Sequence, residues 1–310
     1  MESKKLLVTA SPHITSPVST RQLMGNVIIA LVPALLASGL IFGARALLVV
    51  GVTVAACVGF EALYCILMKK PVPVGDFSAI VTGLLLAFNL PSTIPLWIAI
   101  VGAFIAIVIV KQLFGGIGCN FANPAIVARI ALAVGFAGRM TAYAFPSVAV
   151  DALASATPLV AGKTVSGASM ILPLLLGTHG GVIGETCALA LIIGGIYLIV
   201  TKTISATIPL TYIGTVIVMS LLLGQDVVLQ VFSGGLLLGA FFMATDYVTS
   251  PFTTKGKLVF GVGLGVITCL IRFYGNMAEG VSYSLLLMNL LVPYINDFTR
   301  QKPLGGAKVK

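Results

Sequence analysis

Long apolar stretches separated by short polar segments dominate the chain. A helix needs about 20 apolar residues to cross the hydrocarbon core of a bilayer. On that scale we expect ten segments, at residues 24–43, 46–68, 77–90, 95–113, 121–136, 181–200, 206–223, 227–245, 258–273 and 281–295. The pattern therefore predicts an all-α, polytopic membrane protein.

The composition agrees with this pattern and excludes other classes. Hydrophobic residues make up 58% of the 310 residues and charged residues only 9%, whereas soluble domains contain about 25% charged residues. The net charge is +9, but the basic residues stand singly at the ends of apolar runs, which is not typical of nucleic-acid binding. The five cysteines form no CxxC pair, so we expect neither an iron–sulfur cluster nor another metal site built by this chain.

The basic residues predict the orientation in the membrane. Of the 18 Lys and Arg residues, 13 fall on the side of the N-terminus, 4 on the other side and 1, Arg129, within a span. Because basic loops stay in the cytoplasm, both termini are expected there. The predicted divisions are a cytoplasmic segment 1–22, a first five-helix unit 23–136, an external loop 137–180, a second five-helix unit 181–297 and a basic cytoplasmic tail 298–310.

The two five-helix units resemble each other. Residues 83–93, GLLLAFNLPST, are similar to residues 235–245, GLLLGAFFMAT, and a helix with a basic and aromatic end follows each. Two halves with an odd number of spans must face opposite ways, so the sequence predicts an inverted repeat. The third and fifth segments are short and flanked by Gly and Pro, which favours half-helices; ordinary kinked helices are the alternative.

One polar stretch stands out in the predicted external loop. Residues 151–157 read DALASAT and precede a proline. Taken alone, an Asp, a Ser and a Thr in a loop are typical of a solvated turn or a helix cap.

Motifs along nearly the whole chain, from about residue 11 to about residue 297, carry a family resemblance. The chain resembles the D subunit of the Rnf complex, whose family is related to the B subunit of the sodium-pumping NADH:quinone reductase. The motifs are SPH at 11–13, MGNVIIALVP at 24–33, GDFSAIVTGLLL at 75–86, NFANPAIVAR at 120–129, IGET at 183–186 and MATD at 243–246.

The resemblance gives the polar stretch a function. In this family a loop motif D-x-x-[ST]-G-A-T receives FMN, whose phosphate a flavin transferase esterifies to the threonine. Thr157 matches the acceptor, and Asp151 and Ala156 match their positions. The sequence departs from the motif at two positions, with Ala154 in place of Ser or Thr and Ser155 in place of Gly.

The resemblance also implies the setting. The chain would be a flavoprotein subunit of a bacterial or archaeal cytoplasmic-membrane complex that moves electrons between ferredoxin and NAD and translocates Na+ or H+. A noncovalent riboflavin nearer the cytoplasm is implied by the quinone-reductase relative. The sequence has no GxGxxG motif after a strand, so the partners would be a ferredoxin-side iron–sulfur subunit, a NAD-side flavin subunit, a second FMN-carrying subunit and small membrane subunits. The alternative is a channel or secondary transporter without a redox role.

Three further residues are candidates for the flavin sites. An arginine inside a membrane is costly unless it is paired or faces a polar cavity, so Arg129 either stabilises the flavin phosphate and the reduced flavin or pairs with an acid such as Glu185. Asn120 and Asn123, beside Pro124, either offer amide donors to a cofactor or cap a helix.

Acidic residues within the spans are candidates for the ion path. We single out Asp76, Glu185 and Asp246, and place Asp76 and Asp246 at comparable positions of the two repeats. For Asp76 the alternative is that it caps the short third helix.

Overall fold

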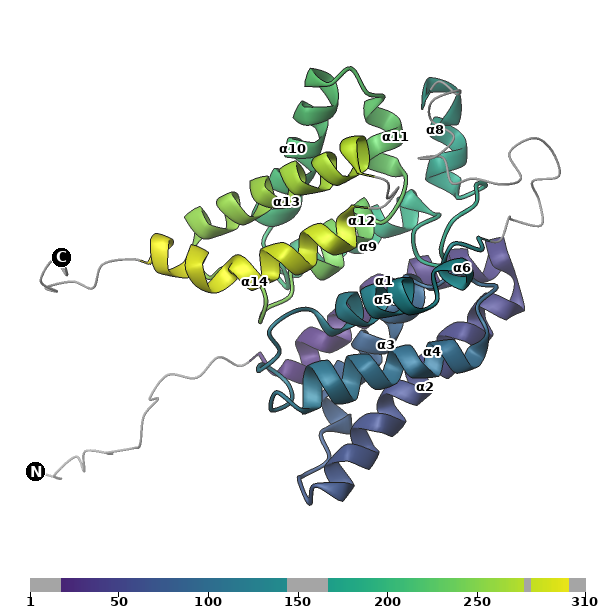
Figure 1. Cartoon of the computed structure of the whole chain (residues 1–310), viewed down its shortest axis with the longest axis vertical. Coiled ribbons are helices and arrows are strands. Elements are labelled where there is room, and N and C mark those ends of the chain that lie inside the picture. The colour runs from purple at the N-terminus through teal and green to yellow at the C-terminus, as the bar shows by residue number, and fades with distance from the viewer. Residues whose placement is uncertain (1–17, 144–166, 276–279, 301–310) are drawn as a thin grey trace, which may run out of the picture.

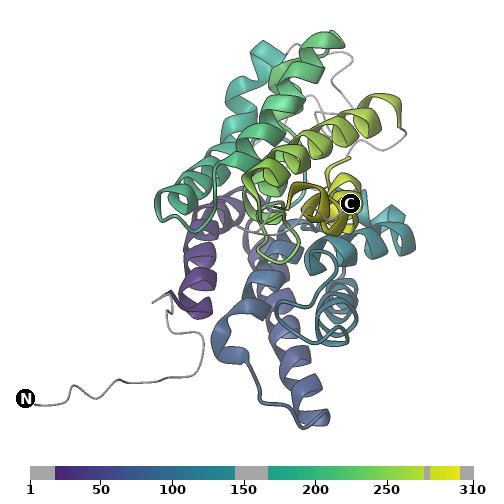
Figure 2. The ribbon, with the colours of Figure 1, turned by 90° about the vertical axis from the view of Figure 1, so that its left-hand side faces the viewer.

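The computed structural model describes residues 18–143, 167–275 and 280–300 (Figure 1). The described part of the chain is helical and contains no extended strand, so the predicted all-α class is confirmed. The N-terminal and C-terminal halves form two neighbouring groups of helices, which Figures 1 and 2 show one above the other.

The N-terminal half contains two long helices followed by shorter ones. Its elements are α1 (Thr20–Phe42), α2 (Ala44–Leu67), η1 (Val74–Asp76), α3 (Ser78–Phe88), α4 (Leu96–Phe104), η2 (Ile105–Gln112) and α5 (Pro124–Gly135). Ser19 caps α1 by accepting a hydrogen bond from the Gln22 amide. Gly43, at a φ of 73°, makes the break between α1 and α2 that a residue with a side chain would adopt only with strain.

The C-terminal half begins after two short helices, α6 (Ala137–Met140) and α8 (Gly167–Leu176). Its elements are α9 (Ala188–Val200), α10 (Thr207–Leu222), α11 (Val227–Phe232), α12 (Leu236–Leu238), η3 (Gly239–Met243), α13 (Thr254–Tyr274) and α14 (Val281–Thr299). The predicted loop 137–180 is therefore partly helical at both of its ends.

Only three of the described helices, α1, α2 and α13, are long and apolar enough to cross a membrane alone. α3 has 11 residues and α5 has 12, and at 1.5 Å per residue each covers about half of a 30 Å hydrocarbon core. The short third and fifth segments are thus confirmed, whereas ten continuous spans are not.

Two predicted segments differ from the structure. The segment 227–245 is broken into α11, α12 and η3, with Gly234 at a φ of 67° in the break. The segment 181–200 becomes helical only at Ala188. Residues 183 and 184 instead donate backbone hydrogen bonds to the carbonyls of Leu90 and Phe88, at and just beyond the end of α3. Periodicity did not reveal either break because the polar residues there, Ser233 and Glu185-Thr186, form short interruptions between apolar residues.

Within each half, the helices pack against one another in a similar order. α2 packs against α3 and α4, and α10 packs against α11 and α13. α5 packs on α4 and η2, and α14 packs on α13, while α1 and α9 pack on each other across the two halves. The packing order is similar in the two halves, and the five-plus-five inverted repeat stays a prediction.

The interior is closely packed and the outside is apolar. A Cβ at Gly194 of α9 would collide with the carbonyl oxygen of Ala30, so the glycine allows α1 and α9 to approach closely. Leu40, Leu222 and Phe298 are 83%, 75% and 91% exposed. Large apolar side chains that face outward in such number mark a surface that contacts lipid or other subunits.

Candidate functional site

The predicted flavin-acceptor stretch, with Asp151, Ser155 and Thr157, lies outside the described residues. The described chain stops before it at Tyr143, which is half-buried. Burial raises the pKa of the Tyr143 phenol, and the nearby Glu185 carboxylate raises it further.

Arg129 is paired inside the protein. It lies on α5 and is buried, its Nη2 atom is 3.4 Å from Oε1 of Glu185, and its Nη1 atom donates a 2.6 Å hydrogen bond to the Ser282 hydroxyl of α14. Since α5 belongs to the first half and α14 to the second, the hydrogen bond between Arg129 and Ser282 connects the two halves. Of the two roles that the sequence left open, the structure shows the pairing with an acid.

Backbone hydrogen bonds position Glu185. The carbonyls at the C-terminal end of α3 have no partner within the helix, and the amides of Ile183 and Gly184 bond to Leu90 and Phe88 at distances of 3.1 and 2.9 Å. A Cβ at Gly184 would collide with Phe88, so only glycine permits this approach. The turn carries Glu185 to Arg129.

The two asparagines contact the start of α5. The Asn123 side-chain oxygen accepts from the Ala125 amide at 3.1 Å, which caps α5, and the Asn120 amide donates to the Ala122 carbonyl at 3.0 Å. Both residues also line a cavity. Capping and cavity lining therefore coexist at this site.

Asp76 is the last residue of η1, and its carboxylate bonds to the first residue of α3. Its Oδ1 atom accepts from the Ser78 amide at 2.8 Å and from the Ser78 hydroxyl at 2.6 Å. Asp226 is the N-cap residue of α11 and accepts from the amides of Val228 at 3.0 Å and Leu229 at 3.4 Å. Asp246 follows the end of η3 and accepts a hydrogen bond from the Thr249 hydroxyl at 3.1 Å, and its comparable position to Asp76 stays a prediction.

A cavity of about 380 Å³ lies between the two halves. Most of its wall is apolar, and a few polar side chains point to one ligand-sized space. They come from α3, η2, the start of α5 and the segment after η3, and they include Ser78, Thr82, Lys111, Asn120, Asn123, Thr245 and Asp246. A mainly apolar space with a few converging polar groups is typical of a small-molecule site.

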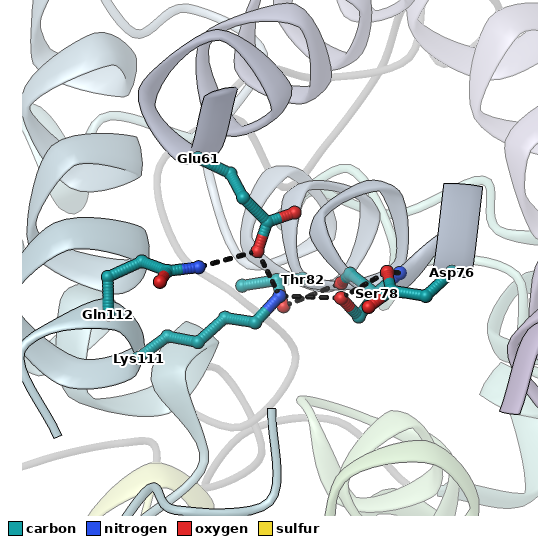
Figure 3. A network of polar contacts seen from close by, with 6 residues as sticks. All are labelled: Glu61, Asp76, Ser78, Thr82, Lys111 and Gln112. Atoms are coloured by element: carbon teal, nitrogen blue, oxygen red, sulfur yellow. Dashed lines mark hydrogen bonds and ion pairs between the residues drawn. The ribbon is translucent and has the colours of Figure 1, made fainter. Parts of the chain in front are cut away.

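A buried ionic network beside the cavity was missed from the sequence (Figure 3). Lys111 of η2 forms an ion pair with Glu61 of α2, with 2.7 Å between Nζ and Oε1, and donates a 2.6 Å hydrogen bond to the Ser78 hydroxyl. The Gln112 amide donates to the same Glu61 oxygen at 2.8 Å. The only sign of this network in the sequence was that an acidic residue and a lysine each lie inside an apolar run.

Lys111 and Arg272, which the count of basic residues assigned to loops, lie in helices and bond to other parts of the protein. Lys111 is only 4% exposed and belongs to the Glu61 network. Arg272 lies in α13 and donates to the Gln230 carbonyl at 2.6 Å and to the Ser233 carbonyl at 3.4 Å, which are carbonyls near the break after α11. Without Lys111 the side of the N-terminus has one basic residue fewer, and without Arg272 the other side also has one fewer. The predicted excess of basic residues on the side of the N-terminus therefore remains.

Comparison with known proteins identifies the family. The model of the NQR2, RnfD, RnfE family matches residues 7–305. The chain is 49% identical over 315 residues to the D subunit of the Na(+)-translocating ferredoxin:NAD(+) oxidoreductase complex of Acetobacterium woodii, covering 100% of this chain and 98% of that one. It is 40% identical to the D subunit of the proton-translocating ferredoxin:NAD(+) oxidoreductase complex of Clostridium ljungdahlii, covering 96% of each chain. It is 36% identical to the D subunit of the ion-translocating oxidoreductase complex of Stutzerimonas stutzeri, covering 93% of this chain and 92% of that one. The chain belongs to the NQR2, RnfD, RnfE family.

Proposed function

We propose that this chain is the D subunit of an ion-translocating ferredoxin:NAD+ oxidoreductase and passes electrons through a covalent FMN on Thr157. The observation that carries the proposal is the similarity along the full length to proteins named as that subunit. The threonine in the DALASAT stretch supplies the hydroxyl that a phosphoester requires. A channel or transporter without a redox role would not need such an acceptor.

The second part of the proposal concerns the cavity, which we assign to a noncovalent riboflavin. Its volume of about 380 Å³ is in the range of small-molecule sites. The isoalloxazine ring has an apolar face and an edge of hydrogen-bonding atoms, and the cavity offers apolar walls with the side-chain oxygen of Asn120 and the side chain of Asn123. Asn123 uses its side-chain oxygen in the cap of α5, which leaves its amide nitrogen to donate to the ring edge.

Different residues of the chain would hold the two flavins. When bound, the flavins supply electron transfer. Thr157 would hold the FMN phosphate in the external loop, and the cavity residues would orient the riboflavin and exclude water. Arg129 would hold the two halves together through its contacts with Glu185 and Ser282. The NAD-binding and iron–sulfur steps belong to partner subunits, and a flavin transferase loads Thr157.

Electron passage is tested in the assembled complex. The complex carrying Thr157→Ala should assemble normally and lose ferredoxin-dependent NAD+ reduction, whereas Ser155→Ala, two residues away, should keep it. For the cavity, acid-denatured chain should release riboflavin that chromatography detects, and Asn120→Leu with Asn123→Ser, which retains a capping hydroxyl, should reduce the amount. Normal activity of the Thr157→Ala complex would contradict the proposal.

A further inference from the structure

Asn289 is a buried polar residue of α14 that lies just outside the cavity. It is 2% exposed, and it is not among the described residues that line the cavity. Burying a side-chain amide is costly unless its nitrogen and its oxygen are both hydrogen-bonded. A buried asparagine therefore needs partners at both ends of its amide, and those of Asn289 connect it to two other segments of the chain.

The neighbours of the Asn289 side chain determine how its amide is oriented. On one side lies the carbonyl oxygen of Thr249, which can only accept, and on the other lies the backbone amide of Asn123, which can only donate. The side-chain nitrogen therefore donates to Thr249 at 3.1 Å and to the Leu285 carbonyl at 3.3 Å, and the side-chain oxygen accepts from Asn123 at 3.2 Å. Both ends of the amide are satisfied in this orientation.

The two partners belong to non-helical segments that line the cavity. The first segment, residues 113–123, contains Asn123, and the second, residues 244–253, contains Thr249. Each segment contributes several residues to the cavity wall. A segment outside a helix has no regular backbone hydrogen bonds of its own, so its position depends on bonds to other elements. Asn289 supplies such a bond to each of the two segments.

Each of these bonds leads to a polar group of the cavity. Asn123 lines the cavity itself, and its side-chain oxygen caps α5. The Thr249 hydroxyl donates to Oδ2 of Asp246 at 3.1 Å, and Asp246 also lines the cavity. A change in the position of Asn289 would therefore move a polar group in each of the two segments.

The helix α14 is a rigid support for this contact. It packs on α5 and on η3, the elements that adjoin the two segments (Figure 1). Ser282, which accepts from Arg129 of α5 at 2.6 Å, precedes Asn289 by seven residues, so the two side chains lie on the same face of α14. Side chains on helices are held more precisely than side chains on loops, so α14 can fix the position of both segments.

We propose that Asn289 is a positioning residue for the riboflavin cavity. It sets the spacing between the segment that contains Asn123 and the segment that contains Asp246, and thereby the geometry in which their polar groups meet the flavin. The inference rests on the proposed function, in which riboflavin occupies the cavity, and it adds a residue that acts on the ligand without touching it.

The experiment measures equilibrium binding of tritiated riboflavin to the purified full-length chain in detergent, counting the label that acid releases. Asn289→Ala removes the bonds to both segments and should bind riboflavin at least about tenfold more weakly than the unaltered chain. Ser284→Ala is the matched control. Ser284 lies on the same helix and is 0% exposed, but its hydroxyl bonds to Thr268 of α13 at 2.8 Å, so its loss should leave riboflavin binding unchanged.

A third variant and a stability measurement separate positioning from folding. Asn289→Asp keeps the size of the side chain and the oxygen that accepts from Asn123, but it loses the amide that donates to Thr249. It should bind riboflavin more weakly than the unaltered chain and more tightly than Asn289→Ala. Thermal unfolding of the riboflavin-free variants gives their stabilities, and Ser284→Ala should lose stability without losing affinity. If Asn289→Ala is not recovered as folded protein, Asn289→Asp carries the test, and it should bind more weakly than Ser284→Ala.

Three results would overturn the inference. They are an unchanged affinity of Asn289→Ala, an equal loss of affinity in Ser284→Ala, and an Asn289→Asp variant that binds riboflavin as tightly as the unaltered chain. In each of these cases the unaltered chain still binds riboflavin, so the cavity assignment stands and only the role of Asn289 fails. An unaltered chain that binds no riboflavin would overturn the cavity assignment together with the inference.

Discussion

Replacing Arg129 tests whether its ion pair joins the two halves of the protein. In Arg129→Gln, the carboxylate of Glu185, which is 4% exposed, would lose the guanidinium 3.4 Å away. Removing one partner of a buried ion pair costs about 3–5 kcal/mol. We therefore expect the free energy of unfolding in detergent to fall by about that amount, and the complex to assemble poorly.

Two further variants separate the charge pair from other effects. Arg129→Gln combined with Glu185→Gln removes both charges, and replacing both partners is often close to neutral, so this variant should be more stable than Arg129→Gln alone. Ser282→Ala, which removes the hydroxyl 2.6 Å from the Arg129 guanidinium, should cost only about 1–3 kcal/mol.

Unfolding titrations of the unaltered chain, the two single variants at Arg129 and Glu185 and their combination form a double-mutant cycle. The pairing explanation requires a coupling of more than about 2 kcal/mol between Arg129 and Glu185. Additive effects of the two single variants would refute it. Arg129 would then have to be considered again as a residue that acts on the flavin, and an unchanged stability with a lowered flavin potential would show that role.

Three other predictions follow from the fold. Asp226→Ala removes the N-cap of α11 and should lower the free energy of unfolding by about 0.5–2 kcal/mol, whereas Asp226→Asn, which keeps a capping oxygen, should cost less; equal losses would count against the capping role. Gly194→Ala forces α1 and α9 apart and should cost about 1–3 kcal/mol in the same titration, and unchanged stability would count against the close helix contact. A reporter fused after Lys310 should be cytoplasmic and one inserted at Lys163 external, and the reverse result would overturn the orientation derived from the basic residues.

The sequence predicted the helical class and the half-helices because these depend on local patterns. The apolar runs fix the class, and the residues Gly75, Pro91 and Asn123-Pro124 mark the ends of α3 and the start of α5. The break between α11 and α12 has a weaker signal, since Ser233-Gly234 lies inside an apolar run, although Gly234 adopts a φ of 67°.

The ionic networks could be predicted only in part. Glu185 was named as a partner for Arg129, because a buried arginine needs an acid. The pairing of Glu61 with Lys111 joins positions 50 residues apart, and Lys111 lies next to a predicted loop, so its charge was taken as a topology signal. A turn of π-helix near the end of a span places Lys111 inside the protein, and the helical period of the sequence does not show it.

The modification of Thr157 is the central claim, and peptide mass spectrometry measures it most directly. The chain should be purified from a host that contains the flavin transferase and digested, and the peptide containing Thr157 should be compared with the same peptide from Thr157→Ala. The proposal predicts that the Thr157 peptide is heavier by one FMN less one water, fluoresces under ultraviolet light and fragments at that threonine. A Thr157 peptide of unmodified mass, with no flavin on any other peptide, would contradict it.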